Sequence, residues 1–98
     1  MNYSLKITNS AKSEILSTVD WYNESKPNLG QDFLNELNEK FQFIRYFPLA
    51  SPLIIEKEAL RFTFLSKYPF VIYYKIKKNK IVVVTIFHTS QDSSKKLN

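Results

Sequence analysis

His88 is the residue with the clearest chemical potential, because it is the only histidine in the chain. An imidazole titrates near neutral pH and can therefore take up or release a proton under physiological conditions. General-base catalysis also needs a proton within hydrogen-bonding reach and, as a rule, a second group that orients the ring. No Ser or Cys nucleophile motif accompanies His88. The sequence favours a strand-end imidazole bonded to a neighbouring carbonyl or hydroxyl over a catalytic base.

Arg61 is the second candidate, since Arg45 is the only other arginine in a chain that otherwise uses lysine. Its planar guanidinium can bind phosphate or carboxylate with two parallel hydrogen bonds, which lysine cannot do. Arg61 lies in the middle of a predicted strand, between apolar neighbours. It could bind phosphate, or it could hold a helix end or the C-terminal segment in place, and the sequence slightly favours the structural role.

Basic and aromatic residues alternate in the second half of the chain. This pattern is typical of surfaces that stack on nucleic acid and neutralise it, provided that the side chains share an exposed face. The residues concerned are Lys67, Tyr68, Tyr73, Tyr74, Lys75 and Lys77. Because tyrosine is also an ordinary strand residue, the pattern alone does not establish binding.

The turn at 78–79 sets the expected register of the last two strands. A two-residue loop there would pair Lys75 with Val82 and Tyr73 with Val84. Paired residues share a face, so Tyr73, Lys75 and His88 are expected on one side of the sheet. The other side would carry Phe70, Ile72, Tyr74 and Ile76 and form the core face.

The periodicity predicts the elements that would position these residues. A short strand at 3–7 precedes a helix that Asn9 or Ser10 would cap and that ends near Ser25. "KPNLG" (26–30) predicts a tight turn, in which Gly30 permits the fold-back, followed by a second helix that Pro48 ends. Strands are predicted at 60–65, 70–77 and 80–88. The result is an α+β fold, β-α-α-β-β-β, with a helix hairpin on one face of a small, mostly antiparallel twisted sheet.

Composition narrows the class of protein further. A chain of 98 residues predicts a single domain over 1–98, with about 89–98 as a polar, mobile tail. The sequence has no cysteine, one histidine and one glycine, so we expect no metal site, no cofactor and no glycine-rich phosphate loop. No apolar stretch approaches the roughly 18 residues that span a bilayer, and no secretory signal is evident. We therefore expect a cytoplasmic protein without a membrane partner.

Charge is unevenly distributed along the chain. Residues 1–48 carry five Lys and Arg against six Asp and Glu, a net of −1, and residues 49–98 carry nine against three, a net of +6. This asymmetry suggests a polyanionic or acidic partner. An ordinary lysine-rich, solvated surface is an equally good interpretation.

The order of several segments resembles a known family. "SAKSEI", "WY", "LGQDFLNEL" and "FP" come first, followed by Arg61, "YPFVIYYKI" and "IVVVTIFHTSQD". Over about residues 5–92 this resembles the RelE/ParE superfamily of toxins from type II toxin–antitoxin systems, in its plasmid stabilisation branch. The resemblance implies a small bacterial toxin that inhibits growth until its cognate antitoxin neutralises it. It also implies that operator DNA is bound only through the antitoxin.

Two mechanisms occur in that superfamily, and the resemblance leaves open whether this chain is an enzyme. ParE-like members bind DNA gyrase, whereas RelE-like members cut mRNA on the ribosome with a basic cluster and a C-terminal Tyr or His. If the chain is a nuclease, Arg61 and His88 are the expected catalytic residues. A degenerate toxin that only binds an antitoxin is a third possibility.

The sequence departs from the nuclease pattern. Phe70-Val71 stands where an arginine would be expected, and no tyrosine follows Tyr74. His88 matches a histidine that is frequent in the ParE-like and plasmid stabilisation branch, where an arginine often follows three residues later; Gln91 stands at that position here. Lys57 and Lys67 are the loose substitutes for the missing cations. The expected target- or nucleic-acid-binding residues are therefore Lys57, Lys67, Tyr73, Lys75 and Gln91.

Overall fold

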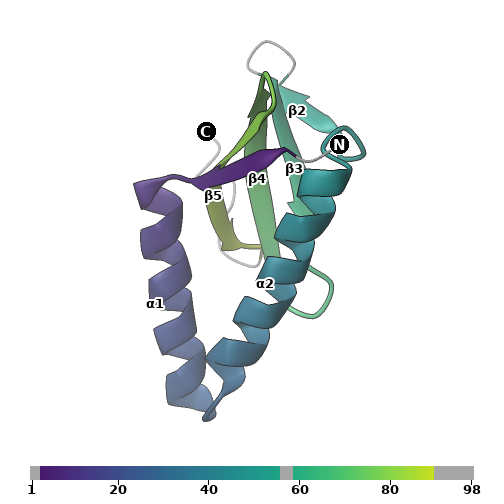
Figure 1. Cartoon of the computed structure of the whole chain (residues 1–98). Coiled ribbons are helices and arrows are strands. Elements are labelled where there is room, and N and C mark those ends of the chain that lie inside the picture. Colours follow the sequence, from purple (N-terminus) through teal and green to yellow (C-terminus); the bar gives the residue numbers. More distant parts are fainter. Residues whose placement is uncertain (1–2, 56–58, 90–98) are drawn as a thin grey trace.

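The computed structural model describes residues 3–55 and 59–89, which form a helix hairpin and a five-stranded sheet (Figure 1). The elements are β1 Ser4–Ile7, α1 Asn9–Ser25, α2 Leu29–Tyr46, β2 Leu53–Ile55, β3 Leu60–Phe64, β4 Phe70–Lys77 and β5 Lys80–His88. The strand order is β1-β5-β4-β3-β2; β1 is parallel to β5 and the other pairs are antiparallel. The predicted α+β architecture is confirmed. The structure also contains the short strand β2, which was not predicted.

Both faces of the sheet are apolar near its centre, but only one contacts the helices. The inner face packs against α1 and α2 and includes the four predicted core positions Phe70, Ile72, Tyr74 and Ile76. The outer face carries a smaller cluster of buried residues, Val71, Tyr73 and Phe87, against which Leu60 and Phe62 pack. A side chain's position along its strand therefore determines which of two separate surfaces it reaches.

Thr8, rather than Asn9 or Ser10, is the N-cap of α1. Its Oγ1 accepts a hydrogen bond from the backbone N–H of Ala11 at 3.1 Å and donates one to the carbonyl of Val84 at 2.8 Å. The prediction placed the cap one or two residues too late. Asn9 and Ser10 are also residue types whose side chains can accept a hydrogen bond from a first-turn amide, so residue type alone did not identify Thr8. The contact with Val84 explains the choice, since it joins the Thr8 hydroxyl to β5 as well as to the first turn of α1.

We expect Thr8→Ala to lower the free energy of unfolding by about 1 kcal/mol, the typical cost of losing an N-cap side chain. Chemical denaturation followed by circular dichroism measures this. Thr8→Ser keeps the hydroxyl and is the matched control. An alanine variant as stable as the serine variant would contradict the capping role.

The turn between the helices differs from the prediction in its use of glycine. The left-handed residue is Asn28, with φ 70°, whereas Gly30 has no positive φ and already belongs to α2. A Cβ on Gly30 would lie 2.7 Å from the carbonyl oxygen of Val19 in α1. Gly30 is therefore needed for the close approach of the two helices and not for the turn.

A β-bulge in β5 alters the predicted register. Lys75 pairs with Val82 as expected, but Tyr73 pairs with Thr85 instead of Val84, because one extra residue lies between the pairs at Tyr73 and Tyr74. An extra residue shifts the alternation of every side chain beyond it. His88 consequently pairs with Phe70, on the inner face, and the prediction that it shares a face with Tyr73 and Lys75 is wrong.

Candidate functional site

Arg61 lies on the inner face of β3, where it pairs with Tyr74 of β4. Its Nη1 donates a hydrogen bond to the carbonyl of Ser51 at 2.5 Å, and the hydroxyl of Tyr74 donates to the carbonyl of Pro48 at 2.8 Å. Both side chains thus hold the segment that follows α2. Burial raises the pKa of Tyr74, and the positive charge of Arg61 acts in the opposite direction. The Arg61 contact is structural, but it reaches a loop carbonyl five residues beyond the end of α2 and not the helix end itself.

His88 ends β5 on the inner face, half-buried. Its ring meets that of Phe70 edge-on, with 5.0 Å between the ring centroids. Arg61 pairs with Tyr74 and His88 with Phe70, so the two candidates are separated by about 13 Å along β4, at roughly 3.3 Å per residue. The structure brings them to the same face of the sheet but not to one point.

Tyr73 and Lys75 share the outer face, as predicted, but Tyr73 is not available for stacking. It is 6% exposed, its ring packs on that of Phe87 at 5.3 Å, and burial raises its pKa. Tyr74 lies on the opposite face, so the basic–aromatic interleaving of the sequence divides between two surfaces. Lys57 and Gln91 lie outside the described residues.

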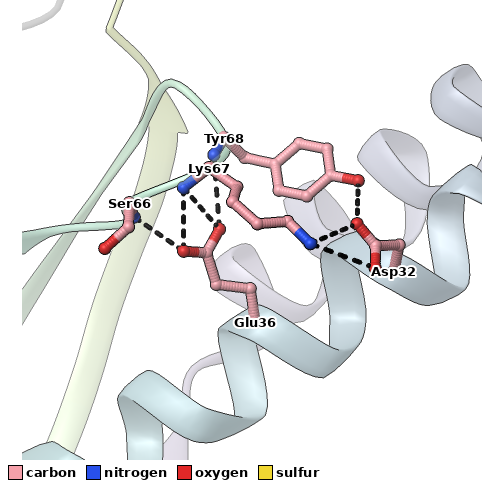
Figure 2. A network of polar contacts seen from close by, with 5 residues as sticks. All are labelled: Asp32, Glu36, Ser66, Lys67 and Tyr68. Carbon is pink, nitrogen blue, oxygen red and sulfur yellow. Dashed lines mark hydrogen bonds and ion pairs between the residues drawn. The ribbon is translucent and has the colours of Figure 1, made fainter.

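Lys67 lies in the turn between β3 and β4, where α2 binds it (Figure 2). The carboxylate of Glu36 accepts hydrogen bonds from the backbone amides of Ser66, Lys67 and Tyr68 at 2.7–3.2 Å. Asp32 accepts from the hydroxyl of Tyr68 at 2.6 Å and lies 3.0 Å from the ammonium of Lys67. The spacing of Asp32 and Glu36, four residues apart on one helix face, was the sequence signal for this network, and the sequence reasoning missed it.

These contacts shift the pKa values of Asp32 and of Tyr68. The hydrogen bond from Tyr68, and then that from Lys67, lower the pKa of Asp32. Burial, and then the bond to Asp32, raise the pKa of Tyr68 to about 12. The carboxylate of Asp32 therefore accounts for part, and not all, of the shift at Tyr68.

We expect the stabilisation from Asp32 to be present above its unfolded-state pKa of about 4 and to be lost as the pH falls through the lower pKa of the folded state. Asp32→Asn should therefore flatten the dependence of unfolding free energy on pH between about 5 and 2. Urea denaturation at a series of pH values measures this. Asp20→Asn, at an exposed position of α1, is the control. Equal pH dependence in the wild type and the Asp32 variant would contradict the assignment.

Neither a metal-ligand group nor a membrane-spanning helix is found in the described part of the chain. Within residues 3–55 and 59–89, no group of three His, Cys, Asp or Glu side chains is arranged to hold a metal ion. No helix among these residues is long and apolar enough to cross a membrane.

Comparison with solved structures defines the class of fold. The chain is similar to a structure described as the chromosomal ParDE toxin–antitoxin system from P. aeruginosa, with a TM-score of 0.78 and 19% identity, over 90% of this chain and 97% of that one. It is also similar to the toxin–antitoxin complex RelBE2 from Mycobacterium tuberculosis, with a TM-score of 0.57 and 15% identity, over 90% and 99%. At these identities the likeness shows the RelE/ParE fold. No match was found among curated protein sequences.

A family model identifies the chain more closely. The model described as ParE toxin of type II toxin-antitoxin system, parDE, matches residues 5–93. The chain belongs to this family and is a toxin of a type II toxin–antitoxin system. The RelE/ParE resemblance inferred from the sequence is thereby confirmed.

Proposed function

We propose that this toxin inhibits bacterial growth by binding DNA gyrase, and that it does not act as a ribonuclease. The observation that carries the proposal is the arrangement of Arg61 and His88. The Arg61 fork is bonded to the carbonyl of Ser51, and His88 contacts Phe70 at a distant position on the same face. Cleavage of RNA needs a base and cations that converge on one phosphate.

Exposed apolar side chains support a function in protein binding. Segment 43–54, which spans the end of α2 and the edge strand β2, carries six large apolar residues that are 39–68% exposed: Phe43, Tyr46, Phe47, Leu49, Leu53 and Ile54. Large exposed apolar side chains of this kind are typical of protein–protein interfaces. A toxin that must bind a target and an antitoxin needs such surface.

Membership of the family supports a proposal for the partners as well. A cognate antitoxin neutralises the toxin, and operator DNA is recognised through that antitoxin in the bacterial cytoplasm. Plasmid stabilisation is the physiological role that we propose for this arrangement. The similar structures are toxin–antitoxin systems, which supports the antitoxin as a partner.

We expect growth inhibition to survive substitution of the two nuclease candidates. Loss of a general base or of a charge-stabilising group costs a nuclease at least about 100-fold in rate. His88→Ala and Arg61→Lys should instead reduce toxicity by less than about 3-fold, since neither residue contacts the target in this proposal. Colony counts after induction without antitoxin measure this. Thermal melts identify any variant that fails to fold.

Pulse-labelling of DNA and protein synthesis within minutes of induction distinguishes the mechanisms. Gyrase inhibition stops DNA labelling first, and purified toxin should then inhibit supercoiling by gyrase. An early stop in protein labelling, with toxicity lost in both variants, would instead establish the mRNA endonuclease. If neither label falls, the chain is a degenerate toxin that retains only antitoxin binding.

A further inference from the structure

Acidic and basic residues are segregated between the two layers of the fold. Every Asp and Glu in the described part of the chain lies on a helix: Glu14, Asp20, Glu24, Asp32, Glu36 and Glu39. The described strands contain none, and they carry the lysines Lys6, Lys75, Lys77 and Lys80. The described strands therefore carry only positive charge, whereas the helical layer carries charges of both signs.

The register places the strand lysines on one face. Lys77 pairs with Lys80, and Lys75 pairs with Val82, which in turn pairs with Lys6 of β1. The intervening residues Ile76 and Ile81 belong to the core, so these lysines lie on the outer face, away from α1 and α2. Together with the turn residue Lys78 they form a cluster at one end of strands β1, β5 and β4, here termed the lysine cluster: Lys6, Lys75, Lys77, Lys78 and Lys80.

This arrangement is unfavourable for the isolated protein. Lys77 and Lys80 are directly opposite each other across the strands, and like charges in that position repel. Lys78 adopts a left-handed conformation with φ 57°. No ion pair is found for Lys6, Lys77, Lys78 or Lys80 among residues 3–55 and 59–89, and all four are exposed. A bound polyanion would relieve this repulsion.

The dimensions of the cluster fit a phosphate backbone. Lys75 and Lys77 are about 7 Å apart along β4, and neighbouring strands are about 4.8 Å apart. Five positive charges thus lie within a few phosphate spacings of one another. Lysine binds phosphate as a point charge and without regard to base sequence.

We propose that the lysine cluster binds the sugar–phosphate backbone of double-stranded DNA without sequence preference. A protein partner fits less well, because lysine is depleted at the cores of protein interfaces. A single strand also fits less well: such sites combine charge with stacking, and the nearby rings of Tyr73 and Phe87 are buried. Sequence-specific recognition of an operator by the antitoxin is a separate contact that this one would reinforce.

The test is fluorescence anisotropy of a labelled 20-base-pair duplex of arbitrary sequence, titrated with the purified chain at several salt concentrations. Neutralising four to five phosphates predicts a slope of log K against log salt of about −4. Lys77→Gln with Lys80→Gln removes two of these charges and should bring the slope to about −2. At low salt the affinity should fall at least about 10-fold.

Lys12→Gln with Lys26→Gln is the matched control, because it removes the same charge from exposed positions of the helical layer. It should leave the slope unchanged. Equal losses in both double variants would reduce the effect to net charge and overturn the proposal. Tighter binding of the corresponding single strand, or binding of polyglutamate in place of the duplex, would also overturn the proposal. The assay contains no gyrase, so its outcome does not depend on the proposed target.

Discussion

Replacing Phe33 by alanine should lower the free energy of unfolding by about 3–5 kcal/mol, the cost of removing a fully buried aromatic ring. Phe33 lies on α2 and is completely inaccessible to solvent. The centroid of its ring lies 5.6 Å from the ring centroid of Tyr22 in α1, 5.5 Å from that of Tyr68 and 5.2 Å from that of Phe70 in β4. One side chain therefore joins both helices to the sheet, and its removal leaves a cavity that three elements border.

Urea denaturation followed by circular dichroism measures this loss. Small domains are stable by only about 5–15 kcal/mol, so the variant should unfold at a much lower urea concentration or be partly unfolded in its absence. Trp21→Ala is the control, because it removes a larger ring that is 58% exposed. A similar loss in both variants would show that the aromatic cluster around Phe33 does not dominate the core.

The elements and the core could be predicted because they depend on local periodicity. The buried residues of the two helices recur at helical spacing, the periodicity from which both helices were predicted: Ala11, Ile15 and Tyr22 on α1, and Phe33, Leu37, Phe41 and Ile44 on α2. The strands 70–77 and 80–88 also have the predicted bounds. Strand β2 was missed because it has three residues and pairs only with β3.

The face of His88 could not be predicted, because distant residues stabilise the bulge that determines it. Thr8 donates to the carbonyl of Val84, and the carboxylate of Glu14 accepts from Thr85 Oγ1 at 2.6 Å and from the amide of Ile86 at 3.1 Å. These contacts join positions more than 70 residues apart. The local sequence of β5 contains no signal for a bulge, so a regular hairpin was predicted.

The same limit applies to the candidate site. Lys67 was an expected binding residue, yet its side chain is bonded to Asp32. Arg61, for which the sequence slightly favoured a structural role, is bonded to Ser51, a partner that the sequence did not indicate. A cation's availability depends on which tertiary partners reach it, and a residue type does not reveal those partners. The lysine cluster, by contrast, follows from register: the correctly predicted 78–79 turn already placed its members on β4 and β5, and the parallel pairing of β1 with β5 adds Lys6.

Gly30→Ala should destabilise the protein by about 2 kcal/mol, although alanine normally stabilises a helix relative to glycine by up to about 1 kcal/mol. The added Cβ would lie 2.7 Å from the carbonyl oxygen of Val19 and 2.8 Å from Asn23 Oδ1. That amide oxygen also accepts the hydrogen bond of the Gly30 N–H at 2.8 Å. The two helices must therefore separate at this contact, and the first turn of α2 loses a partner for one of its free amides.

The sign of the change is the decisive observation. Asn38→Ala adds alanine at an exposed position of the same helix and should raise the stability slightly, so the two variants are expected to differ in direction. Val19→Ala in the Gly30→Ala background removes the Val19 Cγ1 contact, also at 2.8 Å, but leaves the carbonyl in place. It should therefore fail to restore the stability. Full rescue would mean that only side chains limit the approach of the helices, and the sole glycine of the chain would then be dispensable.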